Sequence, residues 1–361
     1  MRRIRRALDS VWPTQSANSI APSLEPTPTG SSVDIELHDL QRRVNDIANN
    51  PDNHRSIAEF FGKLMPRFAE FHWGQQTFFH RFFNQWQDAG FTLLPSGEGQ
   101  LIPHVNRMTD AELGRPFDMS RLTFAKESQA ALARKLVKKF AAETSDPGFG
   151  LGDEFQFRFG NHIFETGDAE LFYAHMRMLA PKRVVQISPG PSTRLIADVL
   201  RRNGGEAEFT VIERARAKVD PLVRGVTRVI ETDARHTDPA VFAELVAGDV
   251  LVVGTDHVVA PGSLAEYVLC EVIPNLNPGV IVHMHPIFLP GPYPVSWVRG
   301  EHVFWNEQNF LAAFLSFNTQ YEVVLAVNHL GKTHPDLLSA LSSRYDPSVS
   351  DPGGFWFRRT A

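Results

Sequence analysis

From residue 183 onward, short apolar runs alternate with segments in which apolar positions recur every three or four residues. The runs are rich in Val and Ile and are bounded by Gly, Pro or Asp, a pattern typical of buried strands. Strands that alternate with helices in this way predict a mostly parallel sheet with helices on both faces, the doubly wound α/β class. The predicted strands are 183–188, 208–213, 228–233, 249–254, 280–285, 321–328 and 355–359, and the predicted helices between them are 192–202, 239–247, 263–273 and 306–317.

The first part of the chain has a different pattern. After a stretch rich in Ser, Pro and Thr, apolar and aromatic positions recur at helical spacing between residues 35 and 87, and two more helices are predicted at 121–143 and 168–179. The Pro- and Gly-containing turn at 145–150 is the predicted domain boundary. The sequence thus predicts a disordered leader (1–33), an aromatic-rich helical N-terminal domain or lid (34–150) and an α/β domain (151–361).

Composition limits the classes of function. A net charge of -5 argues against nucleic-acid binding, and no run approaches the roughly 18 apolar residues that cross a bilayer. The basic N-terminus lacks the apolar segment of a secretory signal, and a single cysteine excludes an internal disulfide. Cys270 lies in the apolar run 267–270 and is predicted to be a core residue. We therefore expect a cytoplasmic protein whose partner is a small-molecule substrate, not nucleic acid or membrane, and which could form a homo-oligomer.

Three features at predicted strand ends favour a nucleoside-containing cofactor, because ligands of open parallel sheets bind beyond the carboxyl ends of the strands. The first strand runs into a tight turn at Gly190, and Ser192 is the predicted N-cap of the next helix, whose N-terminus favours an anion. Glu213 ends the second strand, where an acid can accept hydrogen bonds from ribose hydroxyls. Asp233 ends the third strand and is placed to meet the amino group of an adenine. The alternatives are an ordinary strand–helix turn at Gly190 and a solvated acid at Glu213.

Histidines gather at the ends of the fourth and fifth predicted strands. His257 follows Asp256 after the fourth strand, and His283 and His285 end the fifth. Histidine titrates near neutrality and is the common general base for removing a proton from a hydroxyl or amine. His283 and His285 share one side of a strand, so with Asp256 or His257 they could instead ligate a metal ion. The pattern alone leaves both a catalytic base and a metal ligand open.

Segment 248–259, with the sequence GDVLVVGTDHVV, resembles the fourth-strand motif of a bacterial family of class I S-adenosylmethionine-dependent methyltransferases. The resemblance continues through 271–288 (EVIPNLNPGVIVHMHPIF) and 304–308 (FWNEQ), and it includes 167–170 (GDAE) and 353–356 (GGFW). It covers most of the C-terminal half of the chain, and its most specific part runs from the fourth-strand motif to the FWNEQ segment.

The resemblance implies a seven-stranded methyltransferase-like sheet with an antiparallel edge. It also implies transfer of a methyl group from S-adenosylmethionine to a hydroxyl or amine of a small molecule or sugar, as in secondary metabolism. His257 would be the general base, with His285 and His283 as further catalytic candidates on the acceptor side. The cofactor-binding residues that it implies are Gln186, Ser188, Gly190, Ser192, Glu213, Asp233, Thr255 and Asp256.

The chain departs from the family pattern at four positions. Gln186 replaces the acid of the first motif, Ser188 replaces its first glycine, and Gly254 and Pro286 stand where the family has Asp. Gln accepts a hydrogen bond but supplies no charge, so a loss of about 1 kcal/mol in cofactor binding is expected. The two missing acids argue against a catechol-type magnesium site, and no metal is predicted. Two alternatives stay open: a non-catalytic methyltransferase-like binding protein, and a histidine-rich metal enzyme on the same fold.

Overall fold

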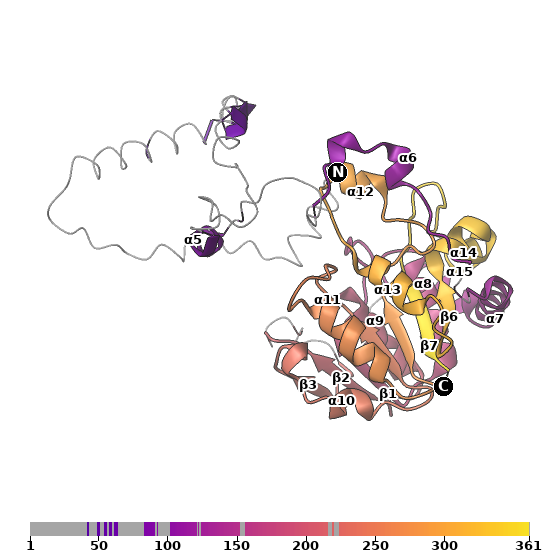
Figure 1. Cartoon of the computed structure of the whole chain (residues 1–361). Coiled ribbons are helices and arrows are strands. Elements are labelled where there is room, and N and C mark those ends of the chain that lie inside the picture. The colour runs from indigo at the N-terminus through magenta and orange to yellow at the C-terminus, as the bar shows by residue number, and fades with distance from the viewer. Residues whose placement is uncertain are drawn as a thin grey trace. The chain divides into compact units, whose positions relative to one another are not determined.

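The computed structural model describes residues 102–360 except 121, 123, 152–155, 216–218 and 220–223, together with scattered residues between 42 and 92 (Figure 1). Contacts divide the chain into two compact units, and the unit that contains Val105–Ala361 holds the sheet. The predicted leader lies outside the described residues. So do most of the predicted aromatic helices, apart from a short helix, α5 (Phe83–Asp88).

The centre of the larger unit is a seven-stranded sheet with the order β3-β2-β1-β4-β5-β7-β6. β1 pairs in parallel with β2 and β4, β2 with β3, and β4 with β5, whereas β7 is antiparallel to both of its neighbours. The strands are β1 (Arg183–Ile187), β2 (Glu208–Ile212), β3 (Arg228–Ile230), β4 (Val250–Val253), β5 (Ile281–Met284), β6 (Tyr321–Ala326) and β7 (Phe355–Arg359). All seven predicted strands are therefore confirmed, and so is the doubly wound sheet with an antiparallel edge.

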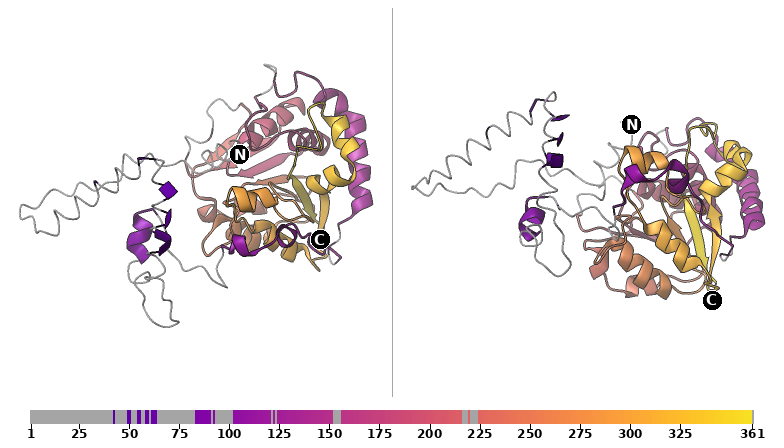
Figure 2. Two further views of the ribbon diagram at one scale, coloured as in Figure 1. Left: turned by 90° about the horizontal axis from the view of Figure 1, so that it is seen from above. Right: turned by 45° about the horizontal axis from the view of Figure 1, so that its top comes forward.

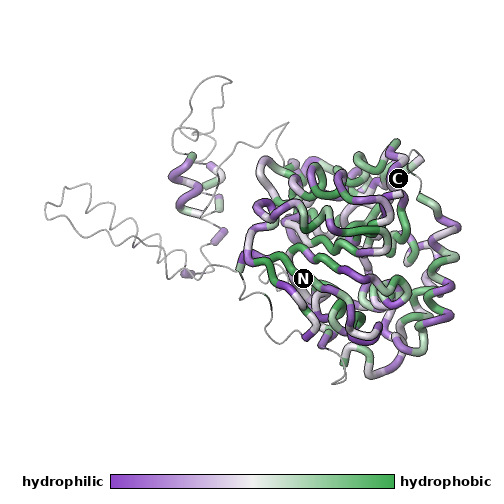
Figure 3. The backbone as a smooth tube through the Cα atoms, turned by 90° about the horizontal axis from the view of Figure 1, so that it is seen from below, coloured by the Kyte–Doolittle hydropathy of each residue, from purple (hydrophilic) through white to green (hydrophobic). Residues whose placement is uncertain are grey.

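Both faces of the sheet are buried, because side chains alternate along each strand. In β4, Val250 and Val252 belong to one hydrophobic cluster, and Leu251 and Val253 belong to the other. Helices cover both faces (Figure 2), and the apolar residues gather in the strands between them (Figure 3). On the first face lie α7 (Lys126–Thr144), α8 (Asp168–Leu179), α9 (Pro191–Arg202), α14 (Val327–Thr333) and α15 (Pro335–Leu341); on the second lie α10 (Ala240–Ala243), α11 (Leu264–Tyr267) and α13 (Glu307–Leu315).

Several elements differ from the predictions. The helix predicted at 263–273 consists of α11, a π-helical turn η5 (Val268–Val272) and a 3-10 turn η6 (Ile273–Asn275). Cys270 is exposed, so its prediction as a core residue is wrong; Leu269 and Val272 take the buried face instead. No pattern predicted the short helices α6 (Asp110–Leu113), α12 (Val295–Gly300), α14 and α15.

The contacts of α7 bear on the division of the chain. This helix packs against α8, α15 and β6, and the unit that holds the sheet begins at Val105. The boundary predicted near residue 150 would instead place α7 with the N-terminal helices.

In the part of the chain that the structure describes, no helix is both long and apolar enough to span a membrane.

Candidate functional site

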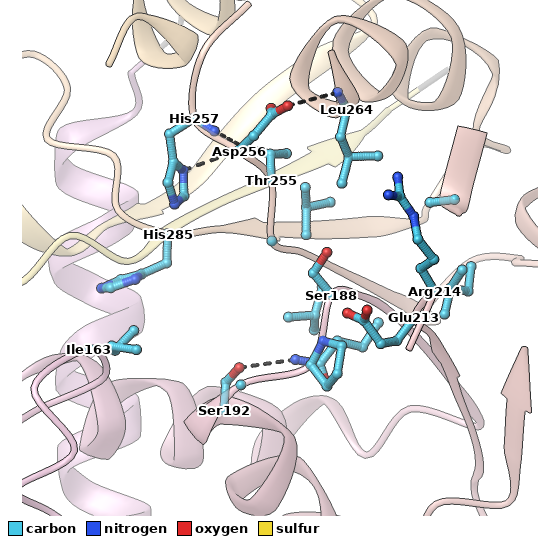
Figure 4. Close-up of a pocket in the computed structure, with 18 of the residues that line it drawn as sticks. Ile163, Ser188, Ser192, Glu213, Arg214, Thr255, Asp256, His257, Leu264 and His285 are labelled. Atoms are coloured by element: carbon cyan, nitrogen blue, oxygen red, sulfur yellow. Dashed lines mark hydrogen bonds between the residues drawn. The ribbon is translucent and has the colours of Figure 1, made fainter. Parts of the chain in front are cut away.

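A cavity of about 710 Å³ lies at the carboxyl ends of β1, β2, β4 and β5. This is the edge of the sheet where the strand order reverses between β1 and β4, the position expected for ligands of such folds. Every residue that the sequence predicted for the site lines this cavity. In Figure 4, His257 and His285 lie on one side of the cavity, Glu213 and Arg214 lie on the other, and Ser188 lies between them.

The turn after β1 forms the floor of the cavity. α9 begins at Pro191 with Gly190 as its N-cap, and the Gly190 N–H donates to Thr193 Oγ1 at 2.9 Å. The prediction of Ser192 as N-cap is wrong, because the fixed φ and missing N–H of proline suit the first helical position. A Cβ atom placed on Gly190 would meet nothing within 4 Å, so the turn leaves open space for a ligand.

Gln186 lines this cavity and carries an acceptor atom without a partner. Its side chain is 1% exposed, and its Nε2 donates to Ser192 Oγ at 3.1 Å (Figure 4). Its Oε1 is buried without a hydrogen-bond partner among the described residues. An unsatisfied buried oxygen costs about 1–3 kcal/mol, so a ligand with an N–H donor would be stabilised here.

The acids after β2 and β3 have different hydrogen-bond partners. Glu213 points into the cavity and accepts a hydrogen bond from the backbone N–H of Ala215 at 3.0 Å. Asp233 accepts hydrogen bonds from Arg235 through the backbone N at 3.0 Å, Nε at 2.9 Å and Nη2 at 2.7 Å, and one from Arg214. The hydrogen bonds from Arg235, followed by that from Arg214, hold the pKa of Asp233 well below its usual range. These four bonds fill the lone pairs of the carboxylate, so an adenine amino group can reach Asp233 only if an arginine leaves.

The predicted cofactor contact at Asp256 has a different use. Its two carboxylate oxygens accept the backbone N–H groups of Leu264 at 3.1 Å and Ala265 at 3.0 Å. The side chain therefore caps the N-terminus of α11, where a negative charge is also favoured by the helix dipole. Asp256 fixes the loop after β4 rather than offering a free oxygen to the cavity.

A buried carboxylate holds His257. Its Nδ1 lies 2.5 Å from Glu307 Oε1, and its ring contacts Trp305 with 4.1 Å between ring centroids. The side chain of His257 is 12% exposed and that of Glu307 is 2% exposed. An anion at Nδ1 fixes the proton on that nitrogen and leaves the lone pair of Nε2 to accept a proton. Sequence reasoning missed the role of Glu307, although this residue stands in the FWNEQ segment on which the family resemblance partly rests.

His285 has a carboxylate partner of its own. Its Nε2 lies 3.0 Å from Asp168 Oδ2, and Asp168 also accepts the N–H groups of Gly353 at 2.9 Å and Gly354 at 2.6 Å. The carboxylate is thus fixed by the backbone and orients the imidazole. Asp168 was missed as well; it stands in the GDAE segment at the start of α8.

His283 differs from these two histidines. It is 2% exposed, both ring nitrogens lack a partner among the described residues, and the ring packs against Phe172 at 4.8 Å and Trp356 at 4.5 Å. Burial, and then the charges of His285 and His175, lower the pKa of His283 well below its usual value. The ring is therefore neutral, and the geometry favours His257 and His285 over His283 as a base. Among the described residues, no group of three or more His, Cys, Asp or Glu side chains is arranged to hold a metal ion.

No family model matches the chain, and no curated protein matches it. One similar solved structure is CmcI with SAH, which is 14% identical with a TM-score of 0.33, over 62% of this chain and 91% of that chain. A second is the SAH-bound methyltransferase PaMTH1 of Podospora anserina, at 16% identity and a TM-score of 0.34, over 66% of this chain and 96% of that chain. A third is the O-methyltransferase TomG of Streptomyces achromogenes with SAM, at 12% identity and a TM-score of 0.35, over 65% of this chain and 96% of that chain. Because the identities and TM-scores are low, these structures identify neither a ligand nor a reaction for this chain.

Proposed function

We propose that the protein is a class I S-adenosylmethionine-dependent methyltransferase that acts on a hydroxyl or amine of a small molecule, in the cytoplasm. One observation carries this proposal: a histidine held by a buried carboxylate faces the same cavity as a glycine turn and an acid at the ends of β1 and β2. A general base is thereby placed opposite groups suited to a nucleoside.

The residues present fit this cofactor. The orphaned Oε1 of Gln186 would accept a hydrogen bond from its ammonium group, and Glu213 would accept from its ribose hydroxyls. The open turn at Gly190, next to Ser188, would let the ligand approach the backbone. When bound, S-adenosylmethionine would supply an electrophilic methyl group, whose bond to sulfur breaks with the electron pair staying on sulfur, so that S-adenosylhomocysteine is the leaving group.

The chain's own part in the reaction is to bind the acceptor and remove its proton. The acceptor O–H or N–H would donate to Nε2 of His257, which takes the proton as the new bond to the methyl carbon forms. Glu307 accepts the Nδ1–H hydrogen bond and thereby stabilises the resulting imidazolium. His285, held by Asp168, is placed to orient the acceptor from the adjacent strand.

Calorimetry with S-adenosylmethionine and S-adenosylhomocysteine tests the proposal. We expect a Kd below about 1 mM for each. A folded protein that shows no heat of binding in the millimolar range would contradict the enzyme assignment.

A second candidate, a methyltransferase-like protein without catalytic activity, is favoured by the uncharged Gln186 and by the hydrogen bond between Asp233 and Arg214. Binding of the cofactor without methyl transfer to any acceptor would support it.

Gln186→Leu should weaken S-adenosylmethionine binding by about 10- to 100-fold, because it removes an acceptor from a charged ammonium donor. Gln320→Leu is the matched control, since Gln320 is exposed and lies outside the cavity lining. We expect at most a small loss in that variant. Equal affinities for Gln186→Leu and the wild type in calorimetry would show that Oε1 does not meet the ligand.

Arg214→Met should strengthen S-adenosylhomocysteine binding by about 5- to 10-fold, because it frees one lone pair of Asp233 for the adenine amino group. Arg214 is 70% exposed at its side chain, so its removal leaves no cavity. Arg228→Met, an exposed change at the amino end of β3 and outside the cavity lining, is the control. Weaker binding in Arg214→Met would instead mean that the guanidinium contacts the ligand.

A further inference from the structure

Glu307 uses its two carboxylate oxygens on different partners. Oε1 meets His257 Nδ1 at 2.5 Å, and Oε2 accepts the hydroxyl proton of Thr255 at 2.5 Å. Glu307 is 1% exposed and is the first residue of α13, a helix N-terminus that favours its negative charge. These two hydrogen bonds therefore fix the orientation of the Glu307 carboxylate toward His257.

The hydroxyl of Thr255 is fully used by this arrangement. A hydroxyl has one proton and two lone pairs, and the proton of Thr255 goes to Glu307. Its oxygen accepts the backbone N–H of His257 at 2.9 Å and also lies 3.4 Å from His257 Nδ1, which takes up the second lone pair. Thr255 is 9% exposed. No proton is left on Thr255 for a cofactor, although the family resemblance implied such a contact.

The backbone of His257 has a conformation that is unfavourable for histidine, and hydrogen bonds of its carbonyl hold it. His257 has φ +60°, in the left-handed region, which costs of order 1–3 kcal/mol for a residue with a Cβ. Its carbonyl accepts N–H groups from Asn306 at 3.1 Å and Glu307 at 3.3 Å, so the loop after β4 is tied to the start of α13. Thr255, which follows β4, links the same two residues through its hydroxyl, because it donates to Glu307 and accepts from the backbone of His257.

We infer that Thr255 is a positioning residue, whose hydroxyl fixes Glu307 and thereby keeps His257 in the Nδ1–H form with Nε2 open to the acceptor. The inference rests on the proposed function in one respect, the assignment of His257 Nε2 as the atom that takes the proton of the acceptor. The hydrogen-bond network itself exists without any ligand. Removing the hydroxyl leaves Glu307 Oε2 buried and without its donor, so the carboxylate turns away from the line to Nδ1.

The test compares Thr255→Val, which keeps the shape of the side chain, with Thr255→Ser, which keeps the hydroxyl. ¹⁵N NMR of the His257 imidazole reports the tautomer, and calorimetry with S-adenosylhomocysteine reports the cofactor contact. In the wild type and Thr255→Ser we expect the two ring nitrogens to be clearly distinct, as in one tautomer. In Thr255→Val we expect their shifts to converge, while the Kd stays within about two-fold of the wild type.

Glu307→Gln is the second variant, because it disturbs the same network without touching Thr255. It should also cause the two shifts to converge. A single Nδ1–H tautomer in Thr255→Val, or failure of Thr255→Ser to retain it, would overturn the inference. So would a Kd more than ten-fold weaker in Thr255→Val with the tautomer unchanged, which would make Thr255 a cofactor contact. If the wild type binds no S-adenosylhomocysteine but the tautomer still depends on Thr255, the positioning role stands and the proposed function fails.

Discussion

His257→Ala is expected to lower methyl-transfer turnover by about 10²- to 10⁴-fold, the usual contribution of a positioned general base. The Kd for S-adenosylhomocysteine should stay within about two-fold, because His257 lies across the cavity from Glu213 (Figure 4). The loss should appear in kcat, since the proton is removed only as the new bond forms.

The measurement is the S-adenosylhomocysteine formed from a fixed panel of phenol, sugar and amine acceptors. His236→Ala is the matched control, because His236 is exposed and lies outside the cavity lining. Glu307→Gln should reproduce most of the loss, since the amide cannot stabilise the imidazolium as an ion does. Turnover in His257→Ala equal to that of the control would reject the base assignment.

His285→Ala separates the two histidines. If His285 orients the acceptor, its removal should raise KM more than it lowers kcat. A larger loss of kcat in His285→Ala than in His257→Ala would move the base to the pair of His285 and Asp168.

The sheet was predictable because each strand is a short apolar run that is buried on both faces, as in β4 with its four buried residues. The short helices were not, since α12, α14 and α15 depend on packing against the sheet more than on periodicity. Residues 327 and 328 were predicted as the end of a strand, yet α14 begins at Val327.

The residues predicted for the site lie together because parallel topology brings the ends of β1, β2, β3, β4 and β5 to one edge, however far apart they lie in sequence. Their partners could not be found in this way. Glu307 and Asp168 come from α13 and α8, and only tertiary packing places them beside His257 and His285.

Tertiary packing also explains why His283 is buried without a partner whereas His285 faces the cavity and pairs with Asp168. Both side chains lie on one side of β5, as predicted, and both contact Phe164. His283, however, pairs in register with Trp356 of β7 and is covered by its ring, whereas His285 lies beyond the strand end. The sequence pattern did not reveal that β7 inserts beside β5 at this point.

The buried histidines should make the free energy of unfolding of the unit that holds the sheet sensitive to acid. His175 and His283 are each 2% exposed, and each packs against Trp356, with ring centroids 4.6 and 4.5 Å away. Burial lowers the pKa of His175 to about 3 and that of His283 well below its usual value. Neither ring can take up a proton in the native state near neutral pH.

The unfolded chain can, because free histidine has a pKa of about 6.5. Stability is therefore present in full above about pH 6.5 and is lost as the pH falls, since the unfolded state binds protons that the native state does not. The loss for His175 is about 1.4 kcal/mol per pH unit, or about 2 kcal/mol at pH 5. His283 acts in the same direction, so the free energy of unfolding should fall steeply between pH 7 and pH 5.

Guanidinium unfolding at pH 7, 6 and 5 measures this dependence, and His175→Phe should reduce it. The substitution removes the titrating group and a ring nitrogen that lacks a partner, while an aromatic side chain still packs on Trp356. We expect the variant to lose about 2 kcal/mol less than the wild type between pH 7 and pH 5. His236→Ala, at an exposed position, should keep the wild-type dependence. If His175→Phe folds and its stability falls with pH as steeply as that of the wild type, His175 does not contribute, and the acid sensitivity must come from other groups.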